Sequence, residues 1–183
     1  MDTETHVRRA TPEDARAISE VQIAGWRHAY RGIVPDAMLD ELDVEAGAER
    51  RREGMVRGAA RGVENHVLEL EGDIVAWAAS GPWRTREGTA VPGLFELYAI
   101  YVEPSRIGTG LGRRLWLAVL EGLPARGARE LRLWTFVDNT RARRFYERAG
   151  FREDARVSRE IHEGTDAWKL CYVRDVEGVG PAA

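Results

Sequence analysis

Hydrophobic residues recur along this chain at two spacings, one typical of helices and one typical of strands. Thr11 and Pro12 favour a helix start, with Thr11 as the cap and Pro12 at the first helical position. An apolar stripe at helical spacing follows and continues to about Trp26. The predicted helices cover residues 11–26, 35–42, 44–57, 112–123 and 140–149.

The strand-like pattern dominates the middle of the chain. Residues 66–70 and 74–79 flank a glycine-containing turn and predict an antiparallel hairpin, and 84–92 is typical of a polar loop. Residues 94–102 are apolar on both faces except for Glu96, which predicts a central strand covered on both sides. Further strands are predicted at 7–9, 131–137, 157–161 and 167–173.

Length and composition favour one soluble domain over residues 1–183. Hydrophobic residues make up 44% and charged residues 31%, and no apolar run approaches the roughly 18–20 residues of a membrane helix. The N-terminus lacks the apolar stretch of a secretory signal, and Cys171 is the single cysteine, so we expect a cytoplasmic protein. A net charge of -3 argues against a nucleic-acid partner.

A glycine-rich turn joins the central strand to the next helix, with Gly108, Gly110 and Gly112 at alternate positions. Such a turn points several backbone N–H groups at one spot, and the helix dipole adds positive potential there. It therefore predicts a phosphate or diphosphate site; the alternative is a flexible loop whose glycines relieve strain. A Walker A loop would continue Gly-Lys-Ser/Thr, whereas Arg113 follows here. A dinucleotide-binding turn would have glycine at position 113. Only Asp138, a candidate for binding ribose, supports the dinucleotide alternative.

The segment 139–151 reads Asn-Thr-Arg-Ala-Arg-Arg-Phe-Tyr-Glu-Arg-Ala-Gly-Phe. It resembles the signature Asn-x-x-Ala-x-x-Phe-Tyr-Glu-x-x-Gly-Phe of the GCN5-related N-acetyltransferases, the GNAT superfamily. The glycine turn resembles the family motif Gln/Arg-x-x-Gly-x-Gly/Ala, with Gly110 and Gly112 at its glycines and Ile107 at its Gln/Arg position. The resemblance implies an α/β GNAT fold, a mixed, mostly antiparallel sheet flanked by helices with a splayed central strand pair.

Acetyl-CoA is the cosubstrate that this resemblance implies, without a metal, in a cleft where strand 94–102 splays from strand 131–137. Its pantetheine arm would pair with the strand backbone like an added strand. The N–H of Ile100 would polarise the thioester carbonyl, and the diphosphate would sit on the glycine turn. The implied coenzyme-binding residues are Ile100, Tyr101, Val102, Ile107, Gly108, Thr109, Gly110, Leu111, Gly112, Arg113, Asn139 and Arg144.

Two titratable residues match catalytic positions of the family. Tyr146 matches the tyrosine that in many members protonates the departing CoA thiolate, which a neutral phenol can do; alternatively it belongs to the apolar face of its helix. Glu96 matches a glutamate that acts as general base in several members, where burial would raise its pKa. The alternatives for Glu96 are a solvated strand start, an ion pair with an arginine, or a water chain as base.

The resemblance implies transfer of an acetyl group to a primary amine of a small molecule or peptide by direct attack. The alternatives are a catalytically silent acyl-CoA-binding module, suggested by Ile107, and a dinucleotide-dependent oxidoreductase. A monomer or homodimer is expected, with no membrane partner. Trp77 is predicted to lie in the core, as is the Cys171 side chain. Four side chains are candidates for either the acceptor pocket or the core: Trp26, His28, Tyr30 and Trp83.

Overall fold

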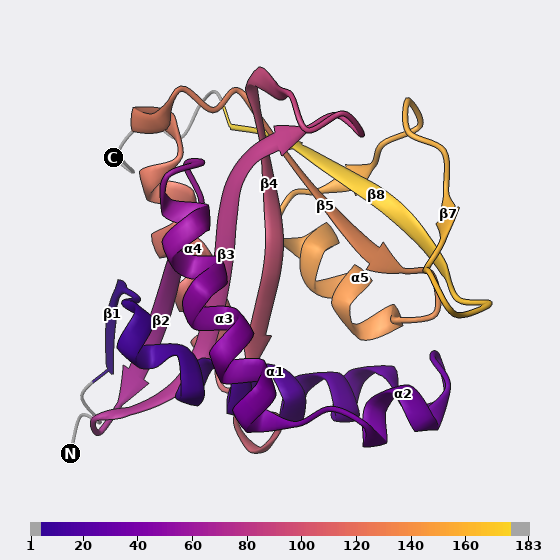
Figure 1. Cartoon of the computed structure of the whole chain (residues 1–183). Helices are drawn as coiled ribbons and strands as arrows, with labels where there is room; N and C mark the ends of the chain where they lie inside the picture. Colours follow the sequence, from indigo (N-terminus) through magenta and orange to yellow (C-terminus); the bar gives the residue numbers. More distant parts are fainter. Residues whose placement is uncertain (1–4, 177–183) are drawn as a thin grey trace.

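The computed structural model describes residues 5–176 and contains one eight-stranded sheet (Figure 1). The strands are β1 (Thr5–Arg9), β2 (Glu64–Leu70), β3 (Asp73–Arg84), β4 (Ala90–Val102), β5 (Glu130–Phe136), β6 (Arg152–Glu153), β7 (Glu160–Ile161) and β8 (Trp168–Asp175). Their order is β1-β2-β3-β4-β5-β8-β6, with β7 paired to β8. Within residues 5–176 the strand pairings are antiparallel except that of β4 with β5, which is parallel.

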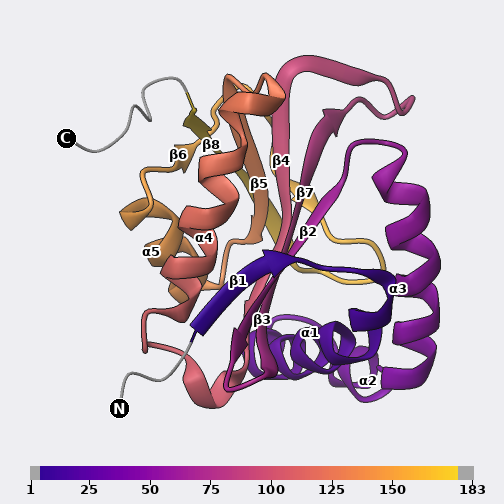
Figure 2. The same cartoon turned by 90° about the vertical axis from the view of Figure 1, so that its left-hand side faces the viewer.

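Helices cover both faces of this sheet. The α-helices of the described residues are α1 (Ala15–Tyr30), α2 (Asp36–Asp40), α3 (Val44–Ala59), α4 (Leu111–Gly122) and α5 (Thr140–Arg148). Figure 2 shows α4 and α5 on one face and α1, α2 and α3 on the other. This arrangement confirms the predicted fold class, a mostly antiparallel α/β sheet flanked by helices.

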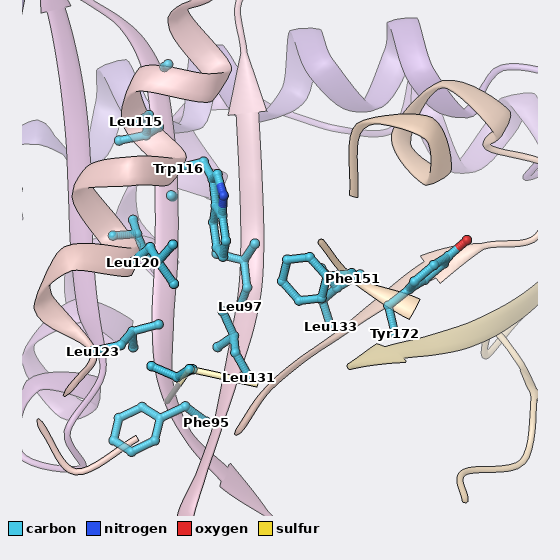
Figure 3. Packing of buried hydrophobic residues seen from close by; sticks show 14 of the residues in the cluster. Phe95, Leu97, Leu115, Trp116, Leu120, Leu123, Leu131, Leu133, Phe151 and Tyr172 are labelled. Atoms are coloured by element: carbon cyan, nitrogen blue, oxygen red, sulfur yellow. The ribbon is translucent and has the colours of Figure 1, made fainter. Parts of the chain in front are cut away.

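The largest hydrophobic cluster lies between α4 and the sheet (Figure 3). Leu115 of α4 and Leu123, the residue that caps this helix, have no exposed surface, and Leu131 of β5 is equally buried beneath them. Burying such a leucine side chain contributes about 1.5–3 kcal/mol relative to leaving it exposed. This packing fixes the N-terminus of α4, and with it the glycine turn, against the end of β4.

A bulge interrupts the pairing of β4 with β3 at Tyr98. Ala99 pairs with Ala79 and Leu97 pairs with Ser80, so Tyr98 has no register partner. The extra residue changes the alternation: Ile100 packs on the α4 side of the sheet with Leu97, whereas Ala99 packs on the α1 side. The prediction of a strand covered on both faces is therefore wrong at Tyr98, whose side chain is 40% exposed.

Several predicted boundaries differ from the structure. The loop predicted at 84–92 is shortened to residues 85–89, because β4 begins at Ala90 and not at residue 94. α1 continues four residues beyond Trp26 and brings Tyr30 onto the helix. β3 extends to Arg84 rather than ending at 79, because β4 pairs with it as far as Arg84. Pro82 is tolerated there because the pairing of β3 with β2 stops at Ser80. The strand predicted at 157–161 is reduced to Glu160–Ile161, since the buried Asp154 side chain accepts hydrogen bonds that form a turn instead.

Candidate active site

The parallel pair β4–β5 opens into a cleft. The two strands pair at three positions: Leu94 with Glu130, Phe95 with Leu131, and Glu96 with Arg132. Beyond these positions β4 stays paired with β3, and β5 stays paired with β8. The strands therefore splay as predicted, and a cleft of about 1110 Å³ lies between them. Alternate backbone groups of a strand point to each side, so this edge of β4 offers hydrogen-bonding groups to an extended ligand.

The glycine turn lies at one end of this cleft. Gly108 and Gly110 both have φ of +91°, a left-handed conformation that other residues adopt only with strain. Gly110 is the N-cap of α4, and a Cβ on Gly112 would lie 3.3 Å from Val102 Cγ2. The first N–H groups of α4 have no partner within the helix, and all three glycines line the cleft. These features suit an anionic group held on the backbone.

Arginine side chains give the cleft a positive charge. Among the described residues, five arginines line it against one carboxylate, that of Asp138. The guanidinium of Arg106 is already paired with Glu103 at 2.8 Å. The lining arginines are Arg106, Arg113, Arg141, Arg148 and Arg174. Guanidinium groups and a helix N-terminus together match the chemistry of a diphosphate-bearing ligand.

The predicted coenzyme residues fall into two groups in the structure. Ile100, Tyr101, Val102, Ile107, Gly108, Gly110, Gly112, Arg113 and Asn139 line the cleft. Thr109, Leu111 and Arg144 do not belong to the lining, and the role of Arg144 stays a prediction. Its neighbour Arg148 lines the cleft instead, and Arg148 Nε donates to the Arg144 carbonyl at 3.0 Å. The spacing of Arg141, Phe145 and Arg148 along one helical face is a sequence signal that could have found Arg148.

Asn139 positions the helix that carries Tyr146. Its side-chain oxygen accepts a hydrogen bond from the Ala142 N–H at 3.1 Å, which caps α5. The Tyr146 ring packs against Phe151 at 5.9 Å and Tyr172 at 6.4 Å between ring centres. Burial raises the pKa of Tyr146 above its ordinary value, so the phenol keeps its proton at neutral pH. Tyr146 lines the cleft, and its protonated hydroxyl is a neutral hydrogen-bond donor.

Glu96 lies at the closed end of the splay, half-buried and outside the cleft lining. Burial raises its pKa to about 7; the ammonium of Lys169 lowers this pKa, and the carboxylate of Glu160 raises it. Arg132, its register partner, pairs instead with Asp154 at 3.0 Å. The alternative of an ion pair between Glu96 and an arginine therefore finds no support among the described residues. The carboxyl can hold or release a proton near neutral pH.

The other aromatic candidates divide between the cleft and the core. His28 and Tyr30 of α1 line the cleft, and Trp26 packs edge-on against Tyr30 with ring centres 5.1 Å apart. Trp77 is 4% exposed, which confirms its predicted place in the core. Trp83 stacks at 6.4 Å on Trp134, which lines the cleft and had no distinguishing signal in the sequence.

Cys171 is buried on β8, as predicted for a small core residue. Burial raises the pKa of its thiol to about 12, so the thiolate is scarce at neutral pH. In residues 5–176, no three His, Cys, Asp or Glu side chains come together in a group able to hold a metal ion. No helix in this part of the chain is long and apolar enough to span a bilayer.

Comparison with known proteins identifies the family. Residues 26–151 match the model of the Acetyltransferase (GNAT) family. N-alpha-acetyltransferase 30 of Schizosaccharomyces pombe is 40% identical over 106 residues, 58% of this chain and 69% of that protein. The chain therefore belongs to the acetyltransferase (GNAT) family. This match confirms the resemblance to the GNAT family. It also confirms the predicted class of enzyme, an acetyl-CoA-dependent N-acyltransferase, so the oxidoreductase alternative is wrong.

Other relatives differ in how much they share with the chain. The uncharacterized N-acetyltransferase YuaI of Bacillus subtilis is 29% identical over 133 residues, 73% of this chain and 72% of that protein. A mycothiol acetyltransferase of Gordonia bronchialis is 40% identical over 91 residues, and the match covers 46% of this chain but only 29% of that protein.

Solved structures share the fold. The PaiA N-acetyltransferase of Thermoplasma acidophilum, solved with coenzyme A, has a TM-score of 0.75 over 94% of this chain and 99% of that one, at 17% identity. A GNAT-family protein of Desulfovibrio desulfuricans has a TM-score of 0.71 at 26% identity, covering 94% of this chain and 99% of that one.

Proposed function

We propose that this protein transfers the acetyl group of acetyl-CoA to a primary amine of a small molecule or a peptide by direct attack. The observation that carries the proposal is the cleft itself, which joins an unpaired strand edge, an anion site and a protonated phenol in one continuous space. The coenzyme bound to PaiA and the peptide and small-molecule names of the relatives support the donor and the range of acceptors.

The chain's own groups can supply each proton and hydrogen bond that this transfer needs. Glu96, with a pKa near 7, takes a proton from the ammonium form of the acceptor, directly or through water. The Ile100 N–H on the open edge of β4 donates to the thioester oxygen as negative charge develops there. Tyr146 donates its phenolic proton to the departing sulfur, and the proton released by the amine nitrogen restores the phenol.

The coenzyme groups fit the two ends of the cleft. The diphosphate lies on the glycine turn, where a Cβ at Gly112 would be in tight contact with Val102, and the neighbouring Arg113 also lines the cleft. The acceptor enters from the side formed by the C-terminal half of α1, where His28 and Tyr30 line the cleft.

A thiol-release assay with a panel of amines tests the proposal. We expect CoA release from acetyl-CoA only in the presence of particular amines, together with an acetylated acceptor detected by mass spectrometry. Tight binding of acetyl-CoA without release by any amine would instead favour the catalytically silent acyl-CoA-binding module. Failure to bind acetyl-CoA would overturn the assignment of the cleft.

A further inference from the structure

Three phenols from three different elements meet at the cleft. Tyr30 of α1, Tyr101 of β4 and Tyr146 of α5 all belong to its lining. The hydroxyl oxygens of Tyr30 and Tyr101 lie 2.9 Å apart and share a hydrogen bond, although 71 positions separate them in the chain. In addition to burial, the proximity of Tyr146 raises the pKa of Tyr101, and the proximity of Tyr30 raises the pKa of Tyr146.

The Tyr30–Tyr101 pair has one hydrogen to spare. Two hydroxyl groups carry two hydrogens, and the bond between the oxygens uses one of them. Trp26 Nε1 is buried beside the pair. An indole N–H only donates, so it cannot accept the spare hydrogen. The cleft offers one candidate acceptor, the Tyr146 oxygen, which makes no hydrogen bond to the described part of the chain.

We propose that the Tyr30–Tyr101 pair positions Tyr146 by directing its spare O–H toward the Tyr146 oxygen. This inference rests on the proposed role of Tyr146. As the Tyr146 O–H bond breaks and the S–H bond of CoA forms, negative charge develops on the phenolic oxygen, and a donor there stabilises it. The pair itself keeps both of its protons. Catalytic hydrogen bonds are often long in unliganded enzymes and shorten when the substrates are bound.

The packing around Tyr101 holds this pair in place. A Cβ on Gly25 of α1 would lie only 2.7 Å from Tyr101 Cδ1, so the helix backbone approaches the tyrosine ring at a position that admits only glycine without a shift. On its other side the Tyr101 ring stacks on Trp77 at 6.2 Å. Tyr30 is held edge-on by Trp26 and Phe136.

A double-mutant cycle tests the inference. We expect Tyr101→Phe to lower kcat about 2- to 10-fold, as for loss of one hydrogen bond, with KM for the amine and affinity for acetyl-CoA unchanged. In a Tyr146→Phe background the same substitution should have no further effect, because it acts only through the phenol that is gone. Tyr98→Phe is the matched control: it removes a phenol that donates to the Pro82 carbonyl at 2.6 Å and should leave kcat unchanged.

The outcomes separate this inference from the proposed function. Additive losses in the double variant, or an unchanged kcat for Tyr101→Phe where Tyr146→Phe is slow, would overturn the positioning role and leave the acetyltransferase proposal intact. A thermal midpoint that falls along with kcat in Tyr101→Phe would show a packing role instead. Absence of turnover by the unmodified protein with every amine would overturn the proposed function, and with it this inference, which rests on that function.

Discussion

Glu96 and Arg132 are the last pair of residues at which β4 and β5 lie side by side. The guanidinium of Arg132 pairs with Asp154 at 3.0 Å, so within residues 5–176 the half-buried Glu96 carboxyl has no arginine to hold it ionised. Burial therefore dominates and raises its pKa to about 7. The point where the strands separate thus holds a carboxyl with a pKa near neutral pH, next in the chain to Leu97 of the cleft lining.

Glu96 should set the acidic limb of the pH–rate profile. Because its carboxylate must be ionised to accept a proton, we expect kcat/KM to fall below a pH of about 7. Glu96→Gln should lower kcat/KM and remove this limb, with acetyl-CoA affinity unchanged. Steady-state kinetics from pH 5 to pH 9 would measure the pH dependence of kcat/KM for both proteins. The same limb in Glu96→Gln would return this residue to a structural role.

Two neighbouring charges provide opposite controls for that assignment. Lys169 lowers the pKa of Glu96, and Glu160 raises it. Lys169→Gln should therefore shift the acidic limb to higher pH, and Glu160→Gln should shift it to lower pH. The two residues form an ion pair with a separation of 2.9 Å, so each variant also changes the position of the other charge. Shifts in the same direction would contradict Glu96 as the titrating group.

The raised pKa of Glu96 also predicts a pH dependence of stability. The folded state binds the Glu96 proton more tightly than the unfolded state, whose pKa is near 4.5. The free energy of unfolding should therefore decrease as pH rises from about 4.5 to 7, by up to about 3 kcal/mol for this group. Glu96→Gln should lose this component. Urea unfolding at pH 5 and pH 8 measures the difference between the two proteins; equal pH dependence would show that Glu96 titrates normally.

Gly110 should be required for coenzyme binding. Its φ of +91° strains any β-branched side chain, and such a side chain would also stand among the N–H groups at the start of α4. We expect Gly110→Val to weaken acetyl-CoA binding at least tenfold, about 1.4 kcal/mol. Gly122→Ala, at the other end of α4 with no atom within 4 Å of its added Cβ, should leave affinity unchanged. Isothermal titration calorimetry of both variants compares the two ends of one helix.

Local sequence signals predicted the parts of the site that depend on neighbouring residues. The glycine turn and the helix carrying Tyr146 could be predicted because their spacing is contained within a few residues of the chain. The bulge at Tyr98 could not, since it depends on how β4 aligns with Ala79 and Ser80. The contact of Tyr30 with Tyr101 spans 71 positions and exists only when α1 docks on β4. Long-range register and docking leave no periodic pattern in a single sequence.

Gly25 should be needed for the docking of α1. An added Cβ would lie 2.7 Å from Tyr101 Cδ1, so Gly25→Ala must displace a ring that is packed on both sides. We expect the free energy of unfolding to fall by about 1–3 kcal/mol, as for overpacked cores. Gly54→Ala on α3 is the control: nothing lies within 4 Å of its added Cβ, and it should gain about 0.5–1 kcal/mol. Urea denaturation distinguishes them; equal effects would mean that the contact at Tyr101 relaxes freely.

Tyr146 should act on the chemical step and not on binding. Negative charge develops on the CoA sulfur as the bond to the acetyl group breaks, and the buried phenol keeps the proton that neutralises it. This interaction is stronger in the transition state than with the bound thioester, so its loss appears in kcat. We expect Tyr146→Phe to lower kcat by about 10²-fold, the low end for general acids, because a thiolate is a good leaving group.

The phenylalanine ring keeps the packing of Tyr146 against Phe151 and Tyr172, so the thermal midpoint should change little. Acetyl-CoA affinity, measured by calorimetry, should also be unchanged. A thioester with a poorer leaving group should suffer a larger loss in Tyr146→Phe than acetyl-CoA does, because it depends more on protonation. Normal turnover by Tyr146→Phe with the best acceptor would show that the phenol is structural and that water donates the proton to sulfur.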